Sequence, residues 1–225
     1  MTATAPLVLA SNSPRRRELL ALGGWTFTVR PADVDESPLP GEAPGTCVLR
    51  LAESKAEACP GGTVIAADTT VAIDGVMLGK PRDAAEAVEM LRRLRGRRHT
   101  VHTGLGVKQG GLLLTDLCAT GVPMRPYSDE EIDAYVASGD PLDKAGAYAI
   151  QHAGFHPVPC SNRDYHVEKF SGCYASVMGL PLCHLVRTLR KMGIVPLADV
   201  PAACQARLQY DCPIHSAVLN GETIG

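Results

Sequence analysis

The sequence lacks a strong net charge, a basic leader and a long apolar run, and each absence excludes a class of protein. Its 225 residues carry a formal net charge of −2. No overall positive field therefore draws the chain to a nucleic-acid polymer or a membrane surface. The opening "MTATAPLVLASNSPRRR" has an apolar run too short for a signal peptide, and no stretch reaches the roughly 18–20 apolar residues of a membrane span. We therefore expect a cytoplasmic protein whose anion binding comes from local clusters.

The cysteines also lack the paired spacing of a common metal or redox motif. There are 8 of them and none forms a CxxC pair, so we expect reduced thiols packed as small apolar side chains. Cysteines are nevertheless concentrated after residue 159, alongside His156, His166, His184 and His215. A metal- or thiol-dependent interaction module at this end is the alternative, although its spacings match no standard ligand pattern.

The order of apolar runs and turn signals indicates an α/β fold. Residues 7–10 are typical of a strand, and Ser13 followed by Pro14 is a strong helix start. The run "TVIAA" at 63–67 predicts a strand buried on both faces, ending at Asp68. Asp74-Gly75 predicts a hairpin turn. Two further strands are expected within 99–122, joined at Gly110-Gly111, and another strand is expected at 145–151. Further helices are expected at 46–62, 83–96, 128–139 and 181–193.

Three consecutive arginines, Arg15 to Arg17, stand where the first strand gives way to the first helix. A helix N-terminus presents unpaired backbone N–H groups and partial positive charge, which favour a bound anion. Arginine suits phosphate because its planar guanidinium can donate two parallel hydrogen bonds. The alternative is a solvated basic helix face.

Other polar residues occupy positions that fit phosphate or metal chemistry. Lys55 continues the apolar series Val48, Leu51 and Ala52 of its helix, so it either extends its amine to solvent or reaches into a cleft. Asp68 follows the buried strand, where ligands bind in α/β sheets, although an aspartate that begins a turn is also common. With Lys80 and Glu36, these residues could form a phosphate and metal site suited to phosphoryl or nucleotidyl chemistry.

The chain resembles the Maf-like nucleotide pyrophosphatases over about residues 7 to 194. The resemblance rests on an ordered set of motifs: "LVLASNSPRRRELL", "DVDES", "RLAESKA", "AADTTV", "GKP", "HTVHTG", "DKAGAYAIQ" and "GLPL". It implies a fold like that of inosine triphosphatase, with a long mixed sheet, flanking helices and two lobes around a cleft. It also implies hydrolysis of a nucleoside triphosphate to the monophosphate and pyrophosphate with a divalent cation, Mg²⁺ or Mn²⁺.

The resemblance assigns roles to individual residues. Asp68 would accept a proton or activate a metal-bound water, and Asp68 and Glu36 would hold the metal. Thr69 and Gln151 match the positions associated with base selection, and Thr, Gln and an arginine at position 15 are typical of the subgroup acting on dTTP and UTP. The triphosphate would be contacted by Arg15, Arg16, Lys55 and Lys80, whereas Arg17 has no matching role and should face solvent.

Several alternatives stay open. A related subgroup prefers 7-methylguanosine triphosphate, and family members have been linked to inhibition of septum formation, so a nucleotide-binding regulator of cell division is a second hypothesis. The resemblance also suggests a homodimer. We predict a catalytic domain at 1–195 and a C-terminal extension at 196–225 of unknown role. The loop at 152–171 is longer than is usual in the family.

Overall fold

The computed structural model describes residues 6–161, 166–167 and 170–224. Its centre is a mixed six-stranded sheet of order β2-β1-β3-β5-β6, with β4 paired to β3. This confirms the predicted α/β class, with a long mixed sheet flanked by helices. The strands of this sheet are β1 (Leu7–Leu9), β2 (Phe27–Val29), β3 (Thr63–Ile73), β4 (Val76–Leu78), β5 (Arg98–Gln109) and β6 (Leu112–Pro123).

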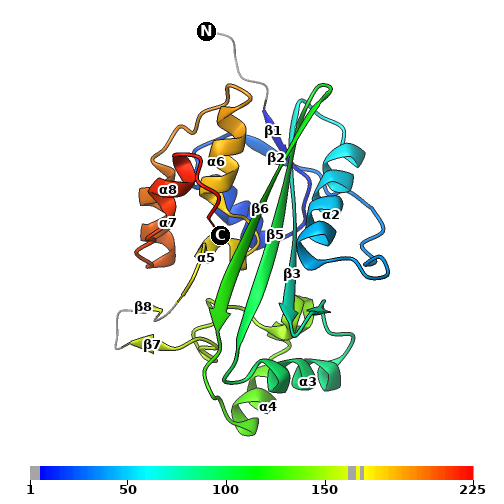
Figure 1. Ribbon diagram of the computed structural model, residues 1–225, viewed down its shortest axis with the longest axis vertical. Helices are drawn as coiled ribbons and strands as arrows, with labels where there is room; N and C mark the ends of the chain where they lie inside the picture. Colours follow the sequence, from blue (N-terminus) through cyan, green and yellow to red (C-terminus); the bar gives the residue numbers. More distant parts are fainter. Residues whose placement is uncertain (1–5, 162–165, 168–169, 225) are drawn as a thin grey trace.

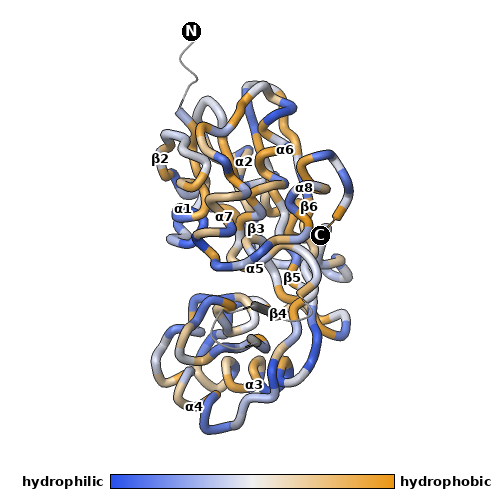
Figure 2. The backbone as a smooth tube through the Cα atoms, turned by 90° about the vertical axis from the view of Figure 1, so that its left-hand side faces the viewer, coloured by the Kyte–Doolittle hydropathy of each residue, from blue (hydrophilic) through white to orange (hydrophobic). Residues whose placement is uncertain are grey.

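The helices form two bodies joined by the long strands β3, β5 and β6 (Figure 1). Seen from the side, α3 and α4 belong to one body, and α1, α2, α6 and α7 belong to the other (Figure 2). The helices are α1 (Pro14–Ala21), α2 (Pro44–Ala58), α3 (Ala84–Leu94), α4 (Asp129–Ala137), α5 (Tyr174–Val177), α6 (Leu182–Arg190), α7 (Val200–Leu208) and α8 (His215–Leu219), with 3₁₀ turns η1 (Asp140–Asp143) and η2 (Ala145–Ala147) and a short pair of strands β7 (Cys160–Ser161) and β8 (His166–Val167). In the described part of the chain, no helix has both the length and the apolar character needed to cross a membrane.

Local sequence signals set most element boundaries. Ser13 caps α1, where its side chain accepts from Arg16 N, and Pro14 takes the first helical position. Ser128 and Glu131 form the expected capping box of α4. The β3–β4 turn at Asp74-Gly75 has positive φ at both residues, 53° and 74°. These positions confirm the sequence predictions.

Helix α2 lies unusually close to the sheet because two glycines of β5 face it. A Cβ on Gly104 would stand 2.4 Å from Val48 O, and one on Gly106 would stand 2.7 Å from Ala52 O. A larger residue at either position would push α2 away from the sheet. The helix carries Lys55 on the same buried face, so this close packing brings the lysine to the sheet.

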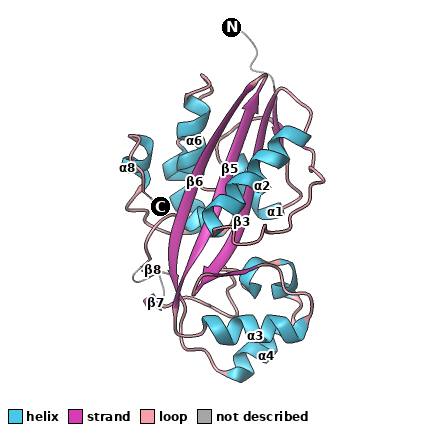
Figure 3. Cartoon of the chain, turned by 45° about the vertical axis from the view of Figure 1, so that its right-hand side comes forward, coloured by secondary structure: helices cyan, strands magenta, loops and turns pink. Residues whose placement is uncertain are grey.

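Figure 3 shows α2 and α6 on different sides of the long strands. Successive side chains of a strand point to opposite faces. Gly104 faces α2, and the neighbouring Thr103 donates a hydrogen bond to Ser176 O of α5 on the other face. The register pairs Asp68 with Gly104 and Thr69 with Thr103. Asp68 and Thr69 are therefore adjacent in sequence but belong to opposite faces of the sheet.

Two strand predictions were wrong. Asp68 does not end its strand, because β3 continues to Ile73 and pairs with β5 along its length. Only β1 ends nearby, since its pairing with β3 stops at Leu9 and Ile65. Residues 145–151 form no strand: they contain the 3₁₀ turn η2, in which Gly146 and Ala147 have φ of 69° and 58°. That left-handed backbone is incompatible with an extended strand.

The C-terminal residues pack on the same body as α1 and α6. Val200, Tyr210 and Val218 are buried, the first two within the main core. The chain just before α7 is also fixed, because Leu197 N donates to Gly23 O and Trp25 Nε1 donates to Val195 O, at 2.9 and 3.0 Å.

Candidate functional site

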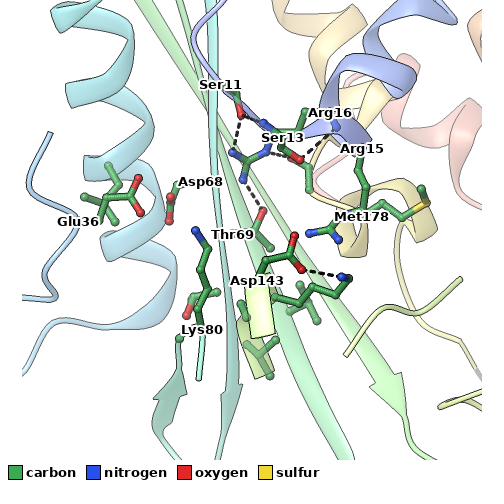
Figure 4. Close-up of a pocket in the computed structure, with 18 of the residues that line it drawn as sticks. Ser11, Ser13, Arg15, Arg16, Glu36, Asp68, Thr69, Lys80, Asp143 and Met178 are labelled. Atoms are coloured by element: carbon green, nitrogen blue, oxygen red, sulfur yellow. Dashed lines mark hydrogen bonds and ion pairs between the residues drawn. The ribbon is translucent and has the colours of Figure 1, made fainter. Parts of the chain in front are cut away.

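A cavity of about 720 Å³ opens beside β3, at the point where its neighbour β1 ends. Beyond Leu9 the β1–α1 turn replaces the strand, so both faces of β3 are accessible from the same opening. Asp68 reaches this opening from one face and Thr69 from the other. The remaining walls come from the loop at 31–38, from α2, from the segment at 143–151 and from residues 177–179. Figure 4 shows these side chains converging from separate elements.

Lys55 and two carboxylates form a compact cluster on the α2 side of the cavity. Lys55 Nζ lies 2.6 Å from Asp68 Oδ1 and 2.6 Å from Glu36 Oε1. Lys55 and Asp68 are both buried, whereas the Glu36 side chain is 54% exposed. Lys55 therefore reaches into the cleft, and this resolves the alternative that it only extends its amine to solvent.

Glu36 is held in its charged form by the basic groups around it. Partial burial alone would raise its pKa, but the hydrogen bond and positive charge of Lys55, with smaller contributions from Lys80 and Arg16, lower the pKa below its usual value. A carboxylate with a depressed pKa is ionised at neutral pH. Glu36 therefore presents a negative charge to the cavity beside Asp68.

Arg16 lies on the other side of β3 and is fixed by three hydrogen bonds. Its guanidinium donates to Gly179 O at 2.9 Å, to Ser11 Oγ at 3.2 Å and to Thr69 Oγ1 at 3.1 Å. Burial lowers the pKa of Arg16 from its usual high value, while the nearby charges of Asp68 and Glu36 oppose that shift. The planar guanidinium of an arginine so constrained is pre-organised for an anionic partner, such as a phosphate, at the N-terminus of α1.

The remaining predicted residues surround the same cavity. Arg15 lines it beside Met178 (Figure 4), and Lys80 approaches from the end of β4. Arg17 is exposed, as expected. Thr69 lies next to Arg16, but Gln151 is an exposed residue in a turn at the rim rather than the last residue of a strand. All of the predicted site residues thus line one cavity: Arg15, Arg16, Glu36, Lys55, Asp68, Thr69, Lys80 and Gln151.

Two charged residues of the cavity wall, Asp143 and Lys144, were not predicted from the sequence. Lys144 is only 7% exposed, and its Nζ contacts Asp143 Oδ1 at 2.6 Å and Asp140 Oδ1 at 3.1 Å. Asp143 itself lines the cavity, where it is labelled in Figure 4. Both residues begin the motif "DKAGAYAIQ", whose remaining residues, 145–151, were predicted to form a strand.

A second cavity of about 380 Å³ adjoins the first. The two cavities share four lining residues, Arg15, Ile150, Gln151 and Met178, and are therefore neighbours. The outer wall of the second cavity includes Arg207, Leu208 and Gln209 at the end of α7. The sequence predicted no role for these residues.

The cysteine-rich end forms no metal cluster in the described part of the chain, where no group of three or more histidine, cysteine or acidic residues could hold an ion. Cys173 and Cys183 are buried free thiols, as expected for small apolar side chains. The side chains of Cys160 and His166, and residues 162–165, lie outside the described residues.

Asp68 and Glu36 fit a divalent cation by their chemistry. Mg²⁺ and Mn²⁺ prefer oxygen ligands, and Mg²⁺ sites for nucleotides use one or two carboxylates together with substrate phosphates and water. In this structure both carboxylates already converge on one cationic atom, Lys55 Nζ. The neighbouring Arg15, Arg16 and Lys80 could accept the phosphates that complete such a site.

The chain is similar to known proteins over most of its length. The family model described as Maf-like protein matches residues 6–192. A dTTP/UTP pyrophosphatase of Anaeromyxobacter dehalogenans (strain 2CP-C) is 50% identical over 191 residues, which cover 83% of this chain and 94% of the relative. Proteins of the same name from Geobacter sulfurreducens and Myxococcus xanthus are 47% and 48% identical, over 83% and 84% of this chain and 96% and 93% of their own length.

Proposed function

This chain belongs to the Maf-like protein family, and from that membership and the site we propose that it hydrolyses dTTP and UTP to the nucleoside monophosphate and pyrophosphate. Relatives that carry the name dTTP/UTP pyrophosphatase share about half of its residues over most of their length. The chain is thus a nucleoside triphosphate diphosphatase, a hydrolase acting on the α–β phosphoanhydride.

The observation that carries this proposal is the convergence of Lys55 on Asp68 and Glu36, within one cavity that also holds the α1 N-terminus and Arg16. Two carboxylates can hold a divalent cation and activate water. The arginines and lysines can hold the charged triphosphate. Nucleotide binding alone would use these carboxylates only to hold a cation, whereas turnover also uses one of them to accept a proton.

In this mechanism, Arg15, Arg16, Lys55 and Lys80 bind and orient the phosphates. Water attacks the α-phosphorus, the bond to the α–β bridging oxygen breaks, and pyrophosphate leaves toward the basic residues. Lys55 contacts Asp68 Oδ1, so Oδ2 is the atom that would accept the proton of the attacking water. A divalent cation held by Asp68 and Glu36 would neutralise the charge that develops on the phosphate oxygens.

The test is pyrophosphate release from a panel of nucleoside triphosphates, with the monophosphate and pyrophosphate separated and quantified by ion-exchange chromatography. The panel contains dTTP, UTP, CTP, ATP, GTP and 7-methylguanosine triphosphate, each with Mg²⁺, with Mn²⁺ and with a chelator. We expect turnover of dTTP and UTP that requires the cation. Tight nucleotide binding without any release would contradict the proposal and favour a regulator, and a preference for 7-methylguanosine triphosphate would place the chain in the other subgroup.

We also propose a cytoplasmic homodimer, as the resemblance suggests. Light scattering coupled to size-exclusion chromatography would give the mass in solution, to be compared with the 23.8 kDa of one chain. A monomer at micromolar concentration would contradict the dimer without affecting the proposed reaction.

A further inference from the structure

A chain of hydrogen bonds runs from Arg16 in the cleft, along the face of the sheet opposite α2, to the backbone of α5. Arg16 Nη2 donates to Thr69 Oγ1 at 3.1 Å, Thr69 Oγ1 lies 3.0 Å from Thr103 Oγ1, and Thr103 Oγ1 donates to Ser176 O at 2.9 Å. Thr69 and Thr103 are directly paired across β3 and β5. Thr103 is fully buried and does not line the cavity.

The direction of every bond in this chain is fixed by proton count. A threonine hydroxyl has one hydrogen. Thr103 gives its hydrogen to Ser176 O, so Thr69 must donate to Thr103. Thr69 then has only lone pairs to offer on the cleft side, and one of them already accepts from Arg16. Its hydroxyl therefore cannot donate to a nucleobase while the chain is intact.

The same chain restricts the position of Arg16. Gly179 O accepts from Arg16 Nε at 2.9 Å. Gly179 has φ of 104°, and a Cβ there would stand 3.1 Å from Arg16 Nε and 3.5 Å from Thr69 Oγ1. Gly179 and Ser176 belong to one short segment around α5. The Arg16 guanidinium and the Thr103 hydroxyl therefore donate hydrogen bonds to carbonyl groups of the same segment.

We propose that Thr103 is a positioning residue of the phosphate site, which acts through Thr69 to hold Arg16 in place. The proposal rests on the proposed function, because Arg16 is taken to bind the triphosphate. It also changes the expected role of Thr69, from selecting the base to orienting an arginine.

The test compares Thr103→Val, which removes the hydroxyl and keeps the shape, with Thr103→Ser, which keeps the hydroxyl and removes a buried methyl. Thr188→Val is the matched control, because Thr188 is equally buried but bonds His184 O and Asp116 away from the cleft. For each variant we would measure kcat and KM for UTP, the thermal midpoint, and the inhibition constant of inorganic tripolyphosphate, which has no base.

We expect Thr103→Val to lower kcat/KM by about 3- to 10-fold, as for the loss of one hydrogen bond in a network, and to raise the tripolyphosphate inhibition constant. Thr103→Ser should stay within about twofold of the wild type in both, even where its thermal midpoint is lower. A folded Thr103→Val with wild-type kinetics would overturn the proposal, as would equal losses in the serine variant. Absence of turnover in the wild type would instead refute the proposed function.

An independent observation concerns the end of α7, which lies outside the residues matched by the family. Arg207 and Gln209 line the second cavity, and Arg15 and Gln151 line both cavities. Arg207 also contacts Glu18 of α1 at 3.1 Å, which places the end of α7 beside the helix that carries Arg15. A substrate with its phosphates at Arg16 and Lys55 and its base at Gln151 would therefore have this wall beyond the base.

We infer that Arg207 and Gln209 contribute to recognition of the nucleoside end of the substrate. This inference also rests on the proposed function. The test uses Arg207→Gln, Gln209→Asn and the double variant, with Arg190→Gln at the exposed end of α6 as the control. Asparagine is chosen because Gln209 has a left-handed backbone, φ 49°, which asparagine tolerates. Loss of the exposed Arg207–Glu18 pair should itself change stability little.

We expect the double variant to raise KM for UTP by about 3- to 10-fold, with kcat within about twofold of the wild type and an unchanged tripolyphosphate inhibition constant. An unchanged KM would overturn the inference. A parallel rise in KM and in the tripolyphosphate constant would also overturn it, because the residues would then act on the phosphates. A wild type without turnover would count against the proposed function alone.

Discussion

Lys55 Nζ and Asp68 Oδ1 lie 2.6 Å apart in the wall of the cleft, where both residues are more than nine-tenths buried. They come from α2 and β3 and meet because Gly104 and Gly106 let α2 approach the sheet. The pair links stability to function. Lys55 and Asp68 neutralise each other in the absence of substrate. In the proposed complex, Lys55 would also contact a phosphate and Asp68 would also contact a cation.

The first prediction concerns Lys55→Met. Methionine suits the apolar stripe of α2, but it leaves Asp68 in a buried position without its ammonium partner. We expect a loss of about 1–3 kcal/mol in the free energy of unfolding, less than for a fully enclosed pair because the site opens to solvent. Chemical denaturation measures this, and activity should fall at the same time.

The double variant Lys55→Met, Asp68→Asn serves as the control for that prediction. With both charges removed, part of the lost stability should return while activity stays low. If Lys55→Met has the same free energy of unfolding as the wild type at pH 7, the ion pair between Lys55 and Asp68 does not stabilise the fold.

The second prediction concerns Asp68→Asn. The amide oxygen can still accept the hydrogen bond of Lys55, so the fold should persist, but the amide cannot take up a proton. Turnover should fall by about 10²- to 10⁴-fold, as measured by pyrophosphate release, with a normal circular dichroism spectrum. Asp74→Asn in the β3–β4 turn, away from the cleft, should leave turnover unchanged. Substantial activity in a folded Asp68→Asn protein would remove Asp68 from the mechanism.

The sequence was sufficient to predict elements that have local signals. Caps at Ser13 and Ser128 and the turn at Asp74-Gly75 depend on neighbouring residues alone, and they were found. The prediction of a strand at 145–151 was wrong because apolar residues are typical of a buried turn as well as of a buried strand. The left-handed backbone at Ala147 has no sequence signal.

The site was predicted as a set of residues, but its geometry was not. Resemblance to a family identified Lys55, Asp68 and Glu36, and the structure brings all three together. The role of Thr103 depends on which residue of β5 pairs with Thr69, and register is a property of two strands distant in sequence. Arg207 was missed because the fold, and not the local pattern, places α7 beside the second cavity.

The third prediction concerns stability in acid. His99 is 3% exposed and lies 2.7 Å from Tyr148 OH, and burial lowers its pKa to about 4. In the unfolded chain the pKa is about 6.5, so the unfolded state binds more protons between these values. The free energy of unfolding should therefore fall as the pH drops from about 6.5 to about 4, by up to about 3 kcal/mol from this residue.

Denaturation at a series of pH values measures that loss. The comparison is His99→Phe, which fills the site without a titratable group and should lose less stability over the same interval, whatever its stability at pH 7. Identical pH profiles for the two proteins would show that His99 is not the group responsible.

The last prediction concerns base selection. We expect higher kcat/KM for UTP and dTTP than for ATP and GTP, because an amide such as Gln151 can both donate to and accept from a pyrimidine edge. Gln151 is exposed at the rim, so a mismatched base leaves it open to water, and the penalty is smaller than the roughly 1–3 kcal/mol of a buried unpaired amide. Gln151→Ala should therefore narrow the ratio of kcat/KM for UTP to kcat/KM for ATP by less than about tenfold.

Thr69→Val should instead lower kcat/KM for all four nucleotides by a similar factor, since Thr69 orients Arg16 and has no hydrogen left to donate to a base. A change of the ratio in Thr69→Val, without a general loss, would return base selection to Thr69 and contradict the hydrogen-bond direction derived above.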